Sequence, residues 1–165
     1  MDSLDIFAEL FIGFAGFSGI VAALRGNRDK EWHEIDRTRL VALIASSIIG
    51  IFSAILPKAL DNLEIDERFV WRISCGFIAT SMLVMFAWTI RRIRQTNAFA
   101  HSDFSPIFII GASLFIFPLI AILSLSALAV YFEANIGLFG MGLLANLIVC
   151  SGMFVLLLRL VLRDA

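Results

Sequence analysis

Side chains that could do chemistry are few in this sequence, and they are scattered. His33 stands among carboxylates in the segment 31–36, far from His101. A single histidine beside acidic residues lacks the spacing of a known metal-ligand set. The sequence contains no Ser/His/Asp set, phosphate-binding loop, His-Glu-x-x-His helix or selectivity-filter motif. We therefore expect no catalytic, metal-binding or cofactor-binding residues, and we do not expect an enzyme.

Two ionisable residues lie inside apolar stretches, where a charge is costly if the surroundings are lipid. Glu9 is the only acidic residue well inside such a stretch, and Arg72 lies about one helical turn into another. An intramembrane ion pair between Glu9 and Arg72 would neutralise both charges at a similar depth. Two alternatives remain open: Glu9 senses ions or protons, or both side chains extend to the membrane interface.

Asn146 and the two cysteines are the other polar or reactive groups within apolar stretches. A mid-membrane amide usually donates a hydrogen bond to another helix, which stabilises the pair by about 0.6–2 kcal/mol. Lining a cavity or pore is the alternative for Asn146. Cys75 and Cys150 differ in expected depth by roughly 12 Å at the helical rise. That separation is too large for a disulfide, so both should be free thiols.

Small residues recur at helical spacing in three segments, which predicts either close helix packing or the lining of a pore. In the first segment, Gly13 and Gly16 share a face with Glu9, and the opposite face carries phenylalanines. We expect the glycine face to meet protein and the phenylalanine face to meet lipid or a bulky neighbour. The phenylalanines are Phe7, Phe11 and Phe14, and the other small or polar ridges are Ala42, Ser46 and Gly50, and Gly142 and Asn146.

The composition places these residues in a membrane protein. Hydrophobic residues make up 60% of the 165 residues, charged residues make up 16%, and the mean hydropathy is +0.93. A soluble domain of this size could not hide so much apolar surface. A soluble enzyme, a nucleic-acid-binding protein and a disordered regulator are therefore excluded.

Five apolar runs, at 4–24, 40–57, 69–90, 106–130 and 136–158, are long enough to approach or exceed the roughly 20 helical residues that cross a bilayer. The runs are continuous rather than alternating, which indicates helices instead of barrel strands. The sequence thus predicts an all-α fold, a polytopic integral membrane protein whose residues 1–165 form one five-helix transmembrane bundle.

Local signals predict where these helices begin, end and bend. The segment 25–27 should end the first helix, and Pro57 should end the second. Asp66 should cap the third, and Pro106 should occupy the first position of the fourth. Pro118 lies within the fourth span and predicts a kink there.

The basic residues predict the orientation. Ten of the 13 Lys and Arg residues fall on one set of alternate sides and three on the other. The N-terminus should therefore be outside and the C-terminus in the cytoplasm, as in a multi-pass protein of the bacterial inner membrane. The ten are Arg25, Arg28, Lys30, Arg37, Arg39, Arg91, Arg92, Arg94, Arg159 and Arg163.

Two functional classes fit these observations. The first is a small homo-oligomeric channel or transport subunit, because small-residue ridges suit packing between copies. The second is a membrane-embedded sensor, anchor or auxiliary subunit of a larger assembly, for example in stress or phage defence. Its protein partner would contact the cytoplasmic loop that contains Arg28, Trp32 and His33. In both, the lipid bilayer is a partner and nucleic acid is not.

Overall fold

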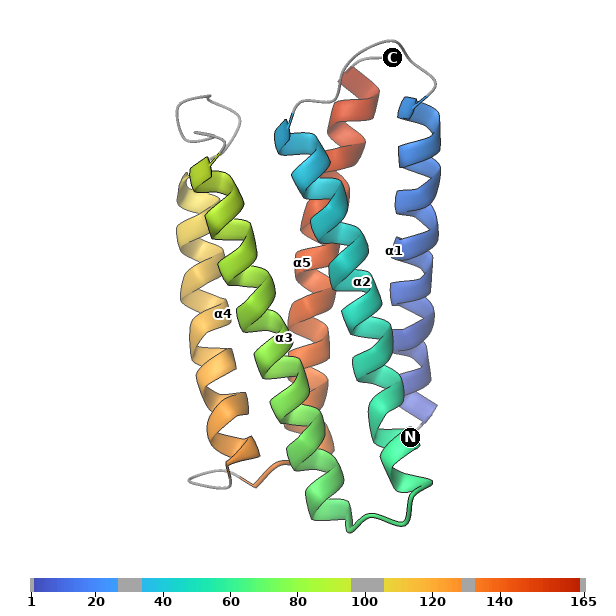
Figure 1. Ribbon diagram of the computed structural model, residues 1–165, viewed down its shortest axis with the longest axis vertical. Helices are drawn as coiled ribbons and strands as arrows, with labels where there is room; N and C mark the ends of the chain where they lie inside the picture. Colours follow the sequence, from blue (N-terminus) through green and yellow to red (C-terminus); the bar gives the residue numbers. More distant parts are fainter. Residues whose placement is uncertain (1, 27–33, 96–105, 129–132, 164–165) are drawn as a thin grey trace.

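The computed structural model describes residues 2–26, 34–95, 106–128 and 133–163, and these form five α-helices (Figure 1). The all-α fold is as predicted. The helices are α1 (Asp2–Gly26), α2 (Glu34–Asp61), α3 (Glu67–Gln95), α4 (Pro106–Ala127) and α5 (Ile136–Arg163).

Four of the helices are long and apolar enough to cross a bilayer. Their apolar stretches are Leu4–Ala23 in α1, Arg37–Asp61 in α2, Glu67–Arg92 in α3 and Ile136–Arg159 in α5. Within the residues searched, the apolar stretch of α4 is shorter, Leu114–Ala127. The chain is therefore compatible with a multi-pass membrane protein, and a fifth span through α4 stays a prediction.

The helices begin and end largely where the local signals place them. α1 ends at Gly26, and Pro106 occupies the first position of α4, where its missing N–H breaks no helical hydrogen bond. Asp66 caps α3, because its Oδ1 accepts a hydrogen bond from Arg68 N at 2.9 Å. Asn135 caps α5 in the same way, since its Oδ1 accepts one from Leu138 N at 2.9 Å.

Pro57 does not end the second helix, and that prediction is wrong. α2 continues through Pro57 to Asp61. The proline ring is fully buried, so packing holds the chain in place around it. Proline removes only one helical hydrogen bond, so the helix can continue past it where packing supports the segment. The helix ends one turn later, where Asn62 N donates to Lys58 O at 3.2 Å.

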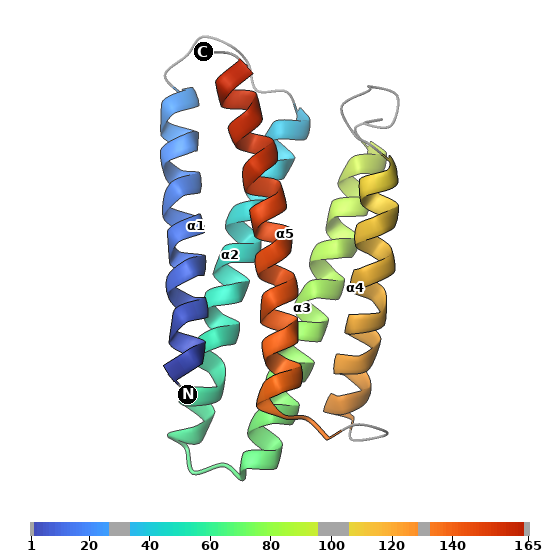
Figure 2. The same ribbon diagram turned by 180° about the vertical axis from the view of Figure 1, so that it is seen from behind.

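The five helices form an antiparallel bundle with α1 and α4 at opposite edges (Figures 1 and 2). α2 and α3 lie between these edges, and α1 packs mainly against α2 whereas α4 packs mainly against α3. α5 crosses the face seen from behind and contacts each of the other four helices. α1 starts near one end of the bundle and α5 finishes at the other.

The centre of the bundle is filled by side chains from all five helices. One fully buried residue from each helix illustrates this, with exposed fractions of 0–1%: Phe11, Leu43, Ile78, Leu123 and Phe139. Small polar residues complete the interior, and Ser47, Ser53, Ser74 and Ser126 are buried as well. The bundle is thus held by close packing between helices and not by a few isolated contacts.

Candidate functional site

The glycine face of α1 points away from the bundle, opposite to the expectation for a single chain. Glu9, Gly13 and Gly16 are exposed, and a Cβ atom built on either glycine would meet nothing within 4 Å. Phe11 on the other face is completely buried, and Phe7 and Phe14 pack against the same core. Among the residues that the structure describes, the phenylalanine face therefore meets protein and the glycine face does not.

The reason for this orientation lies in α2. A Cβ atom on Gly50 would come within 2.5 Å of the Phe11 ring, so the ring occupies the space that the missing side chain leaves. A large ring against a small residue buries more apolar surface than two small residues would. The sequence signal for this contact was present, because a ridge of small residues needs large residues on the helix that packs against it.

The ridge of small residues on α2 faces the interior of the bundle. Ala42 and Ser46 are 3% and 6% exposed, and Gly50 is buried beneath Phe11. Ser47 lies beside the ridge, and its Oγ is 4.0 Å from Cys150 Sγ. This ridge therefore serves packing within the chain.

The ridge on α5 is used in the same way. Asn146 is 6% exposed, and its Nδ2 donates a hydrogen bond to Ser46 O on α2 at 3.1 Å. A Cβ atom on Gly142 would lie 3.2–3.3 Å from Leu123 and Ile78, so α3 and α4 approach α5 closely there. Cys75 and Cys150 are buried free thiols, as predicted.

The structure does not bring Glu9 and Arg72 together. Arg72 Nε donates a hydrogen bond to Ala127 O at 3.0 Å, and its guanidinium lies 5.5 Å from the centre of the Phe69 ring. Glu9 lies on the exposed side of α1, and α2 lies between α1 and α3 (Figure 1). The predicted ion pair is therefore replaced by a contact of Arg72 with the last residue of α4, which the sequence analysis missed.

An ion pair does join α1 to α2, at the end of the bundle where α1 begins. Lys58 Nζ lies 3.7 Å from Asp5 Oδ2, and both side chains are more than half exposed, at 59% and 54%. Such a pair contributes little to stability because water and salt screen it. The pair does show that α1 and α2 both carry exposed charged side chains at the same height of the bundle, which we call the polar level. This level is about one helical turn from Glu9.

The remaining predicted residues are Pro118 and three residues of the segment between α1 and α2. Pro118 lies within α4 with its ring exposed, and the kink there stays a prediction. Arg28, Trp32 and His33 lie outside the described residues. Among the described residues, no group of three or more His, Cys, Asp or Glu side chains could hold a metal ion.

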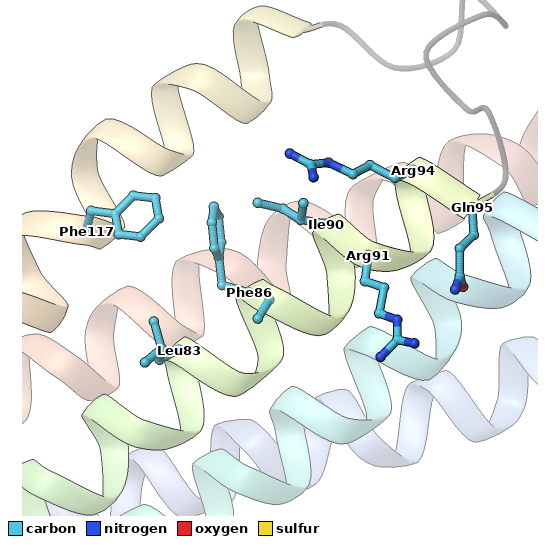
Figure 3. A pocket seen from close by; sticks show the side chains of 8 residues that line it. Leu83, Phe86, Ile90, Arg91, Arg94, Gln95 and Phe117 are labelled. Atoms are coloured by element: carbon cyan, nitrogen blue, oxygen red, sulfur yellow. The ribbon is translucent and has the colours of Figure 1, made fainter.

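A surface groove between α3 and α4 was not anticipated from the sequence. It has a volume of about 560 Å³ and lies toward the end of α3, with Phe86, Ile90, Arg94 and Phe117 among its lining residues (Figure 3). It depends on how two helices pack, and neither sequence segment indicates that alone.

The candidate site is the outward face of α1, which we define as Glu9, Gly13, Gly16 and Ile20. All four residues are exposed, and Ile20 is 53% exposed. The face combines a carboxylate with bare backbone at the edge of the bundle. No family model matches the chain, and neither the curated proteins nor the solved structures include a significant match to it.

Proposed function

We propose that the protein is a multi-pass inner-membrane subunit that assembles with copies of itself into a channel or transporter. The copies contact each other through Gly13 and Gly16 of α1, and the translocation path runs between the copies beside that contact, with Glu9 at its outer end. The N-terminus is outside and the C-terminus is in the cytoplasm, in keeping with the distribution of basic residues. The observation that carries this proposal is the exposure of Glu9, Gly13 and Gly16 on one side of α1.

The packing of the bundle favours a path between chains over one through a single chain. Phe11, Ile78 and Phe139 are fully buried and fill its centre. Asn146 is 6% exposed and its Nδ2 donates to Ser46 O, so its amide is turned into the bundle and away from a solute. The ridges on α2 and α5 are also buried within the chain, which leaves the face of α1 as the free ridge of small residues.

The chemistry of this face favours a protein neighbour over lipid. A carboxylate facing lipid is costly, and intramembrane ionisable groups nearly always face protein or a water-filled cavity. Gly13 and Gly16 allow another helix to approach closely, because nothing lies within 4 Å of a Cβ atom built there. α1 stands at the edge of the bundle, where a second copy can pack without moving α2–α5 (Figure 1).

Glu9 would then lie near the outer mouth of the assembly. It is about one helical turn, roughly 6 Å, from the polar level of Asp5 and Lys58. A ring of carboxylates at a low-dielectric mouth concentrates cations. Monovalent cations are therefore the first class of solute to test.

The test of assembly is a bulky substitution on the face of α1. Gly16→Leu should convert the oligomer to monomer, as measured by light scattering of the purified protein in mild detergent. Gly140→Leu is the matched control, because a Cβ atom on Gly140 in α5 also meets nothing within 4 Å. A wild-type protein that is monomeric in detergent and in lipid nanodiscs would overturn the proposal.

The test of transport is cation flux into liposomes that contain the purified protein. Wild type should conduct K⁺ or Na⁺, and Glu9→Gln should lower that flux severalfold while leaving assembly intact. An oligomer that carries no flux over a range of voltage and pH would reject the channel.

The second candidate is a sensor, anchor or auxiliary subunit that binds a different protein. The closed centre of the bundle favours this second candidate, because a sensor, anchor or auxiliary subunit needs no path for a solute. An absence of flux together with a different chain that co-purifies through α1, and is lost in Gly16→Leu, would support this candidate instead.

A further inference from the structure

The groove between α3 and α4 combines an apolar floor with a basic mouth. Leu83, Phe86, Ala87, Ile90 and Phe117 supply the apolar part, and Arg91, Arg94 and Gln95 stand at one end. Figure 3 shows Phe117 of α4 facing Phe86 of α3, with Arg94 further along α3 toward its end.

The apolar part is a stable feature of the interface between α3 and α4. The Phe86 and Phe117 rings pack edge to face, with centroids 4.9 Å apart and an angle of 76° between the rings. Leu83 and Phe117 are nevertheless 47% and 48% exposed, so the groove is open to its surroundings. From Leu83 to Arg91 the helical rise gives a length of roughly 12 Å.

The basic end lies at the level expected for a membrane interface. The Arg92 guanidinium lies 5.8 Å from the centre of the Trp88 ring, and tryptophan is enriched at membrane–water interfaces. Arg91 and Arg94 are exposed, and in the described part of the chain no carboxylate forms an ion pair with either. The end of the groove therefore carries two exposed guanidinium groups without an acidic partner from the described residues, that of Arg94 on the α4 side of α3 and that of Arg91 on the opposite side.

We infer that this groove binds an anionic phospholipid of the cytoplasmic leaflet, with an acyl chain against the apolar floor and the phosphate beside Arg94, while Arg91 adds positive charge at the mouth. Guanidinium groups bind phosphate oxygens by charge-assisted hydrogen bonds. Charge complementarity at the mouth and the apolar floor of the groove together favour a lipid over a free anion. The inference rests on the membrane location and the orientation of the proposed function, but it does not require the assembly through α1.

The experiment is native mass spectrometry of the protein released from mild detergent with equal amounts of phosphatidylglycerol and phosphatidylcholine. Wild type should retain phosphatidylglycerol in preference. Arg91→Gln/Arg94→Gln should lower that retention about tenfold or more, as expected for two basic residues at a membrane surface. Arg37→Gln/Arg159→Gln is the matched control, because it removes two exposed arginines from outside the groove.

A second variant separates binding of the whole lipid from binding of its phosphate. Ala87→Leu narrows the apolar floor without changing the charge, so it should also lower phosphatidylglycerol retention. Equal loss in the two arginine double variants would overturn the inference, since it would show general attraction by positive charge. Unchanged retention in Ala87→Leu, or full displacement of the lipid by millimolar glycerol phosphate, would overturn it in favour of a site for the free anion.

Discussion

At the scale of single residues, the contact between Gly50 and Phe11 defines how α1 meets α2. The ring fills the space that a Cβ atom on Gly50 would need, and the nearest ring atoms would be only 2.5–2.6 Å from it. These are atoms at the base of the ring, so a small change of rotamer does not relieve the clash. Overpacking in a close-packed interior typically costs about 1–3 kcal/mol.

Gly50→Ala should therefore lower the thermal midpoint of the purified protein, even though alanine is the better helix former. Gly140→Ala is the control and should leave the midpoint unchanged or raise it, because the space there is open. Adding Phe11→Leu to Gly50→Ala should cost less than the two single changes together. Strict additivity of the two changes would show that the side chains do not meet.

At the scale of helices, Arg72 links α3 to the end of α4. Its Nε donates to Ala127 O, the carbonyl of the last residue of α4, at 3.0 Å. Helix C-termini carry unsatisfied carbonyls and partial negative charge, so a guanidinium there is favourable. This contact gives Arg72 a role that does not involve Glu9.

Arg72→Gln should lower stability by about 1 kcal/mol, the scale of a charge at a partly exposed helix end. Arg68→Gln, an exposed arginine one turn earlier, is the control and should have no such effect. Thermal unfolding in detergent measures both. If Glu9→Gln lowered stability as much as Arg72→Gln and the double change cost no more than either alone, the two residues would be paired after all.

The helices themselves could be predicted from the sequence, whereas hydrophobicity alone did not identify the face that α1 turns inward. Continuous apolar runs, the cap at Asp66 and the proline at the first position of α4 identified the elements, because those signals are local. Lipid and a packed interior are both apolar, so hydrophobicity does not distinguish Phe11 from Ile12. Phe11 is fully buried and Ile12 is 55% exposed, and only the fit to Gly50 separates them. The end of α2 was predicted too early, at Pro57, for a related reason, because burial of the proline keeps the helix intact around it.

At the scale of the whole molecule, the two ends of α3 lie at opposite ends of the bundle, so their accessibility tests the predicted orientation. Leu63, just before α3, is 69% exposed, and Gln95 at its other end is exposed as well. The distribution of basic residues predicts that Leu63 is outside and Gln95 is in the cytoplasm.

Single cysteines at these positions, in a background with Cys75→Ala and Cys150→Ala, test this orientation. A membrane-impermeant maleimide added to intact bacterial cells should label Leu63→Cys and should not label Gln95→Cys. Both should be labelled after the cells are broken. Labelling of both in intact cells would mean that α3 does not cross the membrane.

The contacts of α5 also limit the order in which the helices can pack during synthesis. α5 is synthesised after the other helices, yet it contacts all four of them. α1 with α2, and α3 with α4, are pairs of successive helices, so each pair can pack as soon as both of its helices have formed. The hydrogen bond from Asn146 to Ser46 O and the burial of Phe139 and Leu143 can form only after α5 has been synthesised. A chain of which only the first four helices have been made therefore leaves uncovered the apolar surface that α5 later buries.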